Sequence, residues 1–138
     1  MSYFTPQYQD RSPGQKWENL EGYSSDENSL VQLGTSVTTM YTAPSSTNVS
    51  GAITSLAILE DLWLCNASAV DYTVTLHIVK SGGTAGVANS IIYQATIKAN
   101  QSLHYAQMGS LIPAGGTLQG LASVASKISW RATIRVVR

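Results

Sequence analysis

Side chains that could carry out acid–base, metal or nucleophilic chemistry are few and lie far apart in the sequence. The two histidines, His77 and His104, fall on separate segments and have no HxH, HExxH or cysteine–histidine spacing around them. Beyond residue 29 the acids are Glu60, Asp61 and Asp71, and adjacent Glu60 and Asp61 would point to opposite faces of a strand instead of converging as a catalytic pair. The sequence therefore predicts no catalytic residue, no metal site and no enzymatic activity.

Two further patterns are candidates for ligand binding. The glycine-rich SGGTAG at residues 81–86 lacks the lysine and the following helix of a phosphate-binding loop, so it is interpreted as a flexible turn and no cofactor is expected. Trp63 and Trp130 could form an aromatic platform for sugars. Trp130 shares the inward face of its segment and is assigned to the core. Trp63, between Leu62 and Leu64, is retained as the candidate ligand platform.

The composition indicates one domain that is sparsely charged. A chain of 138 residues can bury a core without covalent staples, and the single cysteine, Cys65, excludes an internal disulfide. Charged residues make up only 12% of the chain, so its surface depends on hydroxyls and amides for solubility. There is no run of 18 apolar residues and no basic-then-apolar leader, so neither a membrane span nor a signal peptide is expected.

The charges are divided between the two halves of the chain. Residues 1–71 contain all eight acids with Arg11 and Lys16, hence −6, whereas residues 72–138 contain six bases and no acid, hence +6. One interpretation is that interleaved strands neutralise one another. A second is an acidic and a basic side that stack head to tail in a ring. Nucleic-acid binding is not favoured, because the cations are scattered and only Trp130 lies near one of them, Arg131.

Residues 1–29 are predicted to form an extended N-terminal arm without a regular element. They show no strand or helix period, but they hold five of the chain's aromatic residues, which a purely disordered tail normally lacks. The arm could lie along its own domain and cover an edge. The alternative, which we prefer, is that it reaches a neighbouring subunit, where aromatic side chains are good anchors. These candidate anchors are Tyr3, Phe4, Tyr8, Trp17 and Tyr23.

From residue 30 to residue 138, short β-prone runs alternate with turn residues. This pattern predicts an all-β fold, a single antiparallel β-sandwich of jelly-roll type with about eight strands. The expected strands are residues 30–33, 37–42, 53–66, 71–80, 91–98, 103–108, 117–124 and 128–137.

Four of these segments lead to specific expectations. Residues 71–80 are expected to form the central strand and to bury one face, and residues 66–70 to join it to the preceding strand as a hairpin. In residues 91–98 the alternation predicts that Ile91, Tyr93, Ala95 and Ile97 share a face, and in residues 128–137 it places Trp130 and its alternate neighbours inward. Within residues 53–66, the acidic pair at 60–61 allows a turn between two strands, a bulge in one long strand, or a short helix.

Five short segments of the chain stand out by their order and spacing. They are MYTAP (40–44), LWLCNAS (62–68), YTVTLHIVKSGGTAG (72–86), IIYQATIKANQSL (91–103) and LIPAGGTLQG (111–120). Together they resemble a domain that is common in virion proteins of tailed bacteriophages, in which relatives have a yTAP-like strand, an apolar strand that ends in CN, a TLHIV-like strand, a glycine-rich loop and a GGT-like segment. The resemblance covers residues 37–138, although the closing IRVVR departs from the valine–glutamate–isoleucine ending of many relatives.

The resemblance implies a non-enzymatic structural component of a phage particle, made in the bacterial host cytoplasm and then located in the virion. It would serve as a capsid decoration, a head-fibre base or a collar or tail accessory subunit. Its partners would be major capsid, collar or tail proteins together with further copies of itself as a homo-oligomer. The alternative is a receptor- or carbohydrate-binding sandwich of a phage fibre or tail, with Trp63 as the platform.

Overall fold

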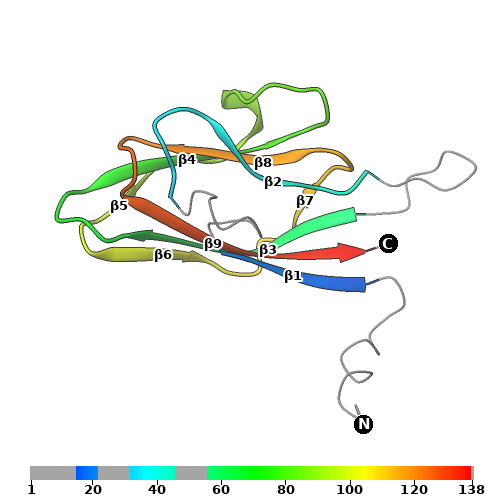
Figure 1. Ribbon diagram of the computed structural model, residues 1–138, viewed down its shortest axis with the longest axis horizontal. Helices are drawn as coiled ribbons and strands as arrows, with labels where there is room; N and C mark the ends of the chain where they lie inside the picture. Colours follow the sequence, from blue (N-terminus) through cyan, green and yellow to red (C-terminus); the bar gives the residue numbers. More distant parts are fainter. Residues whose placement is uncertain (1–14, 22–31, 46–55, 138) are drawn as a thin grey trace, which may run out of the picture.

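The computed structural model describes residues 15–21, 32–45 and 56–137, which form two antiparallel sheets packed as a sandwich (Figure 1). The described residues contain nine strands and one 3₁₀ turn, η1 (Val87–Asn89), which confirms the predicted all-β, jelly-roll-like sandwich. One sheet has the order β1-β9-β3-β6, with β7 also paired to β3, and the other has the order β2-β8-β4-β5. The strands are β1 (Gln15–Glu21), β2 (Thr38–Thr42), β3 (Leu56–Asn66), β4 (Tyr72–Val79), β5 (Ser90–Ile97), β6 (Gln101–Tyr105), β7 (Ser110–Ile112), β8 (Thr117–Ala122) and β9 (Ile128–Val137).

The core lies between the sheets and is filled by alternating apolar side chains. Strand β9 alternates as its sequence predicts, and every second residue from Ile128 to Val136, Trp130 included, is buried. Burying these side chains is the main favourable contribution to the fold, at about 25 cal/mol per Å² of apolar surface. The residues that face them from the other strands include Leu59, Leu62, Leu64, Val74, Leu76, Ile97 and Leu118.

Strand β3 is one continuous strand with a bulge at its acidic pair. Its register against β9 shifts between Leu59 and Asp61, so both Leu59 and Leu62 face the core although they are three residues apart. The extra residue is Glu60, whose carboxylate lies 3.3 Å from the Arg135 guanidinium on β9. The bulge interpretation is confirmed, and the turn and helix interpretations are wrong.

Strand β4 is an interior strand, but it is buried on both faces and not on one. Val74 and Leu76 face the core, while Thr75 and His77 on the opposite face are only 9% and 5% exposed. The segment that precedes β5 covers that face, because Nδ1 of His77 lies 3.0 Å from the Gly86 carbonyl oxygen and 3.1 Å from Oδ1 of Asn89. Since a carbonyl can only accept, Nδ1 carries the proton.

Strand β5 does not follow simple alternation. Its register against β4 shifts around Gln94, which has a positive φ of 48° and donates its backbone N–H to Oγ1 of Thr75. The shift buries Ile92 and Ile97 but leaves Tyr93 54% exposed. Simple alternation, which placed Ile91, Tyr93, Ala95 and Ile97 on one face, therefore does not describe the burial of this strand, because a local backbone irregularity changes its phase.

Residues 66–70 form a corner between the sheets and not the predicted hairpin, because β3 and β4 belong to different sheets. The corner is closed by Asn66, whose side chain is fully buried. Its Nδ2 donates to the carbonyls of Val70 (2.8 Å) and Ile97 (3.0 Å), and its Oδ1 accepts from the backbone N–H of Ser68 (3.0 Å). Turn-forming residues alone do not distinguish such a corner from a hairpin.

Residues 15–21 form an edge strand, which corrects the expectation of an arm without regular structure across residues 1–29. Strand β1 pairs along its whole length with β9, from Gln15 opposite Val137 to Glu21 opposite Arg131. The alternative that the arm covers an edge of its own domain therefore holds for β1. Such pairing satisfies the backbone groups of β9 and requires no side-chain period. Of the expected strand at residues 30–33, Gln32 and Leu33 fall within the described residues. Gln32 forms a bridge with Ser129, and the buried Leu33 donates its backbone N–H to the Ile128 carbonyl at 2.8 Å.

Candidate functional site

The outer face of the five-stranded sheet brings polar and aromatic side chains together in two transverse rows. Trp63 of β3 lies opposite His104 of β6 on one side and Arg131 of β9 on the other. The next row has Cys65 between Ser102 of β6 and Ser129 of β9. Residues directly opposite one another in antiparallel strands project from the same face, so these six side chains share one surface.

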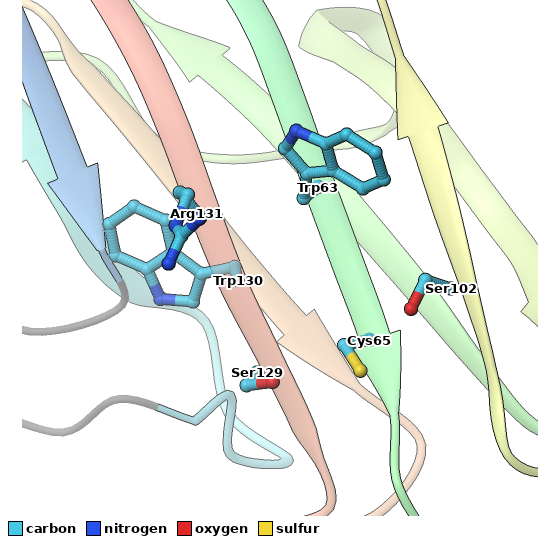
Figure 2. A pocket seen from close by; sticks show the side chains of 6 residues that line it. All are labelled: Trp63, Cys65, Ser102, Ser129, Trp130 and Arg131. Carbon is cyan, nitrogen blue, oxygen red and sulfur yellow. The ribbon is translucent and has the colours of Figure 1, made fainter.

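A shallow depression lies between these rows. Its volume is about 240 Å³, and Trp63, Cys65 and Arg131 line it together with Ser102, Ser129 and Trp130. Figure 2 shows Trp63 on β3, with Arg131 and Ser129 on the β9 side and Ser102 on the opposite side. The depression is therefore an open surface site with one aromatic platform, one guanidinium and small polar groups.

Trp63 is held in place by a stack with His104. The two ring centroids are 3.7 Å apart and the ring planes differ by 2°. His104 Nε2 in turn lies 3.6 Å from Oδ1 of Asp61, and the same oxygen accepts the backbone N–H of Gln107 at 3.1 Å. One face of the indole is thus covered by imidazole, while 44% of the Trp63 side chain remains exposed. The platform is ordered before any ligand arrives.

The two tryptophans that the sequence suggested as a sugar platform lie in different environments. Trp63 is exposed, as a ligand platform must be, whereas Trp130 is 9% exposed, belongs to the core and borders the depression. Of the predicted arm anchors, Trp17 lies in β1 opposite Arg135. The other four, Tyr3, Phe4, Tyr8 and Tyr23, lie outside the described residues.

Sequence reasoning missed His104 as the partner of Trp63. The sequence places the two histidines on separate segments, and it carries no local signal for the β3–β6 register that makes the rings of Trp63 and His104 neighbours. His77 contacts the segment before β5, on the other sheet. Within the described ranges, no group of three or more His, Cys, Asp or Glu side chains could hold a metal ion.

The acids of the first half pair with bases of the second half. Glu60 contacts Arg135, Asp71 lies 3.4 Å from Nζ of Lys98, and Asp61 lies beside His104. Two ion pairs therefore join acids of the first half to bases of the second half, as the interpretation of interleaved strands expects. Asp71 also accepts the backbone N–H of Ala99 at 2.8 Å, and this hydrogen bond, with Lys98 beside it, lowers the pKa of Asp71 below its ordinary value of 3.8.

No helix in the described part of the chain has the length and apolar character needed to cross a membrane. No protein-family model matches the chain, and no curated protein matches it in sequence. Among solved structures, it is similar to the Tobacco streak virus coat protein dimer, with 11% identity over 93% of this chain and 88% of that chain and a TM-score of 0.40.

The chain is also similar to two structures from infectious bursal disease virus. The Gx strain structure gives 16% identity over 88% of this chain, with a TM-score of 0.43. The VP2 subviral particle gives 14% identity over 92% of this chain, with a TM-score of 0.40. This chain spans only 29% and 33% of those two chains. The sandwich described above follows from the strand pairing of this chain itself.

Proposed function

We propose that this chain is a non-enzymatic structural component of a tailed-phage virion, made in the bacterial host cytoplasm and then joined to the particle. The observation that carries the proposal is that the phage-like sequence words fall on the framework of the sandwich. MYTAP overlaps β2, LWLCNAS ends β3 and enters the Asn66 corner, and YTVTLHIVK supplies β4. The segments that resemble phage virion proteins are therefore the ones that build the fold.

The buried polar groups also fit a structural role. Within the described ranges, every buried side-chain nitrogen or oxygen has a hydrogen-bond partner. Buried polar groups with partners stabilise a fold. The chain would act by holding shape and making contacts, as a head decoration, a head-fibre base or a collar or tail accessory subunit.

The attachment segment in this proposal is residues 1–14. Because β1 pairs with β9 of its own domain, the part of the arm before Gln15 is the part available to reach another subunit. That part carries Tyr3, Phe4 and Tyr8. Buried aromatic anchors contribute a large share of the binding energy at protein interfaces. The partners would be major capsid, collar or tail proteins, with further copies of this chain beside it.

Deleting residues 1–14 tests the attachment. The truncated chain retains β1, so it should unfold at the same temperature as the full chain, yet it should no longer join particles. The full-length triple variant Tyr3→Ala, Phe4→Ala and Tyr8→Ala should behave the same way, and the matched triple Ser2→Ala, Thr5→Ala and Gln7→Ala should incorporate normally. Normal incorporation of the truncated chain would show that the arm is not the attachment. The copy number per particle then separates a decoration protein from a collar or tail subunit.

A second candidate function is binding of a carbohydrate receptor, and the exposed Trp63 favours it. A fixed indole beside a depression lined with hydroxyls is a usual arrangement for sugar recognition. Glycan-array binding by the full chain that is lost on Trp63→Ala would support this function. Absence of binding to any glycan would remove it, and would leave the structural role untouched.

A further inference from the structure

We infer that the depression between Trp63 and Arg131 binds an acidic saccharide, a sugar ring that carries a carboxylate. The ring would place its C–H face on the indole and its carboxylate against the guanidinium. The inference rests on the second candidate function, carbohydrate binding. It goes further by naming the site and the charge of the ligand.

The indole of Trp63 has one face available, and that face borders the depression. His104 covers the other face at a centroid distance of 3.7 Å, and His104 is not among the residues that line the depression. The Trp63 side chain is 44% exposed although it sits between the buried Leu62 and Leu64. A rigid apolar plane of this kind matches the C–H face of a pyranose ring, and little entropy is lost in ordering it.

The floor of the depression supplies groups suited to sugar hydroxyls. Ser102 and Ser129 lie on opposite sides of Cys65, and their hydroxyls can each donate and accept hydrogen bonds (Figure 2). Cys65 contributes a small side chain between them. A ring on the indole would therefore meet one hydroxyl from β6 and one from β9, which fits a polyol better than a purely apolar ligand.

The charge of the site favours an anionic ligand. Arg131 is the one charged residue among those that line the depression, and its side chain is exposed. Glu21 of β1 is paired opposite Arg131, and Arg131 also makes a contact within the protein, but its five N–H donors allow a second partner. A carboxylate matches the planar guanidinium fork, and such charge-assisted pairs are about twice as strong as neutral hydrogen bonds. The nearby carboxylate of Asp61 is engaged by His104 and by the Gln107 N–H.

A nucleic-acid strand fits the same face less well. A base could stack on Trp63, but the phosphates of a strand running along β3 would approach the carboxylates of Glu60 and Asp61. Arg135, the next outward cation on β9, is already paired with Glu60 at 3.3 Å. Binding of a nucleic-acid strand needs a row of cations along the path of its phosphates. The depression offers one cation, Arg131.

The test compares two sugars that share a ring and differ in one carboxylate, glucuronate and glucose. The full chain, labelled with ¹⁵N, is titrated with each sugar while the indole N–H signal of Trp63 is followed. We expect saturable shifts with glucuronate at a Kd of about 1 mM, because a ligand this small gains little binding energy in total. We expect glucose to bind about tenfold more weakly, since it lacks the charged partner of Arg131.

Four variants locate the site. Trp63→Ala removes the indole signal, so in this variant binding is followed through the backbone amide signals of Ser102 and Ser129, which should no longer shift with either sugar. Arg131→Gln should reduce glucuronate affinity about tenfold while leaving glucose affinity unchanged. Two control variants should change neither affinity: Tyr93→Ala, which removes an exposed aromatic ring from β5 on the other sheet, and Lys80→Gln, which removes an exposed cation. Amide spectra of all variants report whether each still folds. If Arg131→Gln does not fold, Arg131→Lys, which retains the charge but lacks the planar guanidinium, is measured in its place.

The outcomes separate the inference from the function on which it rests. Equal binding of both sugars through Trp63 would overturn the acidic preference and leave carbohydrate binding standing. Binding of neither sugar, with the wild-type chain folded, would overturn the inference, and the glycan array then decides the broader function. Tighter binding of a short deoxythymidine oligonucleotide through Trp63 and Arg131 would assign the depression to nucleic acid and overturn the inference as well.

Discussion

Trp63 and His104 stack face to face across the β3–β6 pair, with ring centroids 3.7 Å apart and planes 2° apart. The contact joins an interior strand to the edge strand of the sheet, and Oδ1 of Asp61 lies 3.6 Å from Nε2 of the imidazole. The stack therefore serves two purposes. It fixes the indole as a platform and it attaches β6 to β3 beyond their backbone hydrogen bonds.

Replacing His104 by alanine should loosen the platform without unfolding the domain. An aromatic pair contributes roughly 0.5–1.5 kcal/mol beyond burial, so we expect His104→Ala to lower the free energy of unfolding by about 1 kcal/mol in urea titrations. The indole N–H of Trp63 should also show faster motion in ¹⁵N relaxation. His104→Phe restores a ring and should recover both quantities. A rigid indole in the alanine variant would mean that the stack does not position Trp63.

The corner at Asn66 should be the most sensitive polar position of the described fold. Its side chain is fully buried and makes hydrogen bonds to Val70, Ile97 and Ser68. Asn66→Ala leaves the buried Ile97 carbonyl without its donor, whereas the Val70 carbonyl still accepts from Oγ of Ser68. One buried unsatisfied group costs about 1–3 kcal/mol, so we expect a loss of about 2 kcal/mol in the free energy of unfolding. Gln101→Ala removes an exposed amide from β6 and should change it by less than about 0.5 kcal/mol.

The sequence predicted the features that local patterns determine. Strict alternation in residues 128–137 identified the inward face of β9, because a strand buried on one side must alternate. The acidic pair Glu60–Asp61 marked an irregularity in an apolar run and allowed a turn, a bulge or a short helix, and the register against β9 shows that the bulge is present.

The features that the sequence did not predict depend on partners distant in the chain. Strand β1 is held by backbone pairing to β9, which leaves no side-chain period to detect. The Asn66 corner and a hairpin turn use the same turn-forming residues, and they differ only in which sheet receives β4. In the site, Trp63 between two leucines could have faced either way, and its contact with His104 follows from a register that no local motif encodes.

Asp71 should make a contribution to stability that depends on pH. The Ala99 N–H and the Lys98 ammonium lower its pKa in the folded state, so the carboxylate form favours folding. The contribution is present above the unfolded-state pKa, which is ordinarily 3.8, and is lost as the pH falls through the lower folded-state value. We expect Asp71→Asn to lower the Tm slightly at about pH 7 and to match the wild type at about pH 2.

The control for Asp71 is a lysine that lacks such a partner among the described contacts. Lys98→Gln should reproduce part of the Asp71→Asn effect at neutral pH, whereas Lys80→Gln should leave the Tm unchanged across the range. A Tm difference between Asp71→Asn and wild type that persists at low pH would show that the side chain acts through its shape and not through its charge.

Gly120 should tolerate no side chain, because it sits where three strands converge on the core. It lies in β8 opposite Thr38 of β2 and Leu76 of β4. A Cβ at this position would overlap Cδ2 of Leu76 and lie 2.8 Å from Sδ of Met40. Leu76 is fully buried and cannot move into solvent, so the added methyl must displace packed side chains.

We therefore expect Gly120→Ala to lower the free energy of unfolding by about 1–3 kcal/mol, the usual cost of overpacking a core. Gly34→Ala is the matched control. A Cβ at Gly34 meets nothing within 4 Å, so this change should be neutral or slightly stabilising through the unfolded chain, by up to about 1 kcal/mol. Urea denaturation of the two variants measures both effects under the same conditions. Equal stability of the two variants would mean that Met40 and Leu76 can move aside, and that the sandwich is packed more loosely at β2 than its buried side chains indicate.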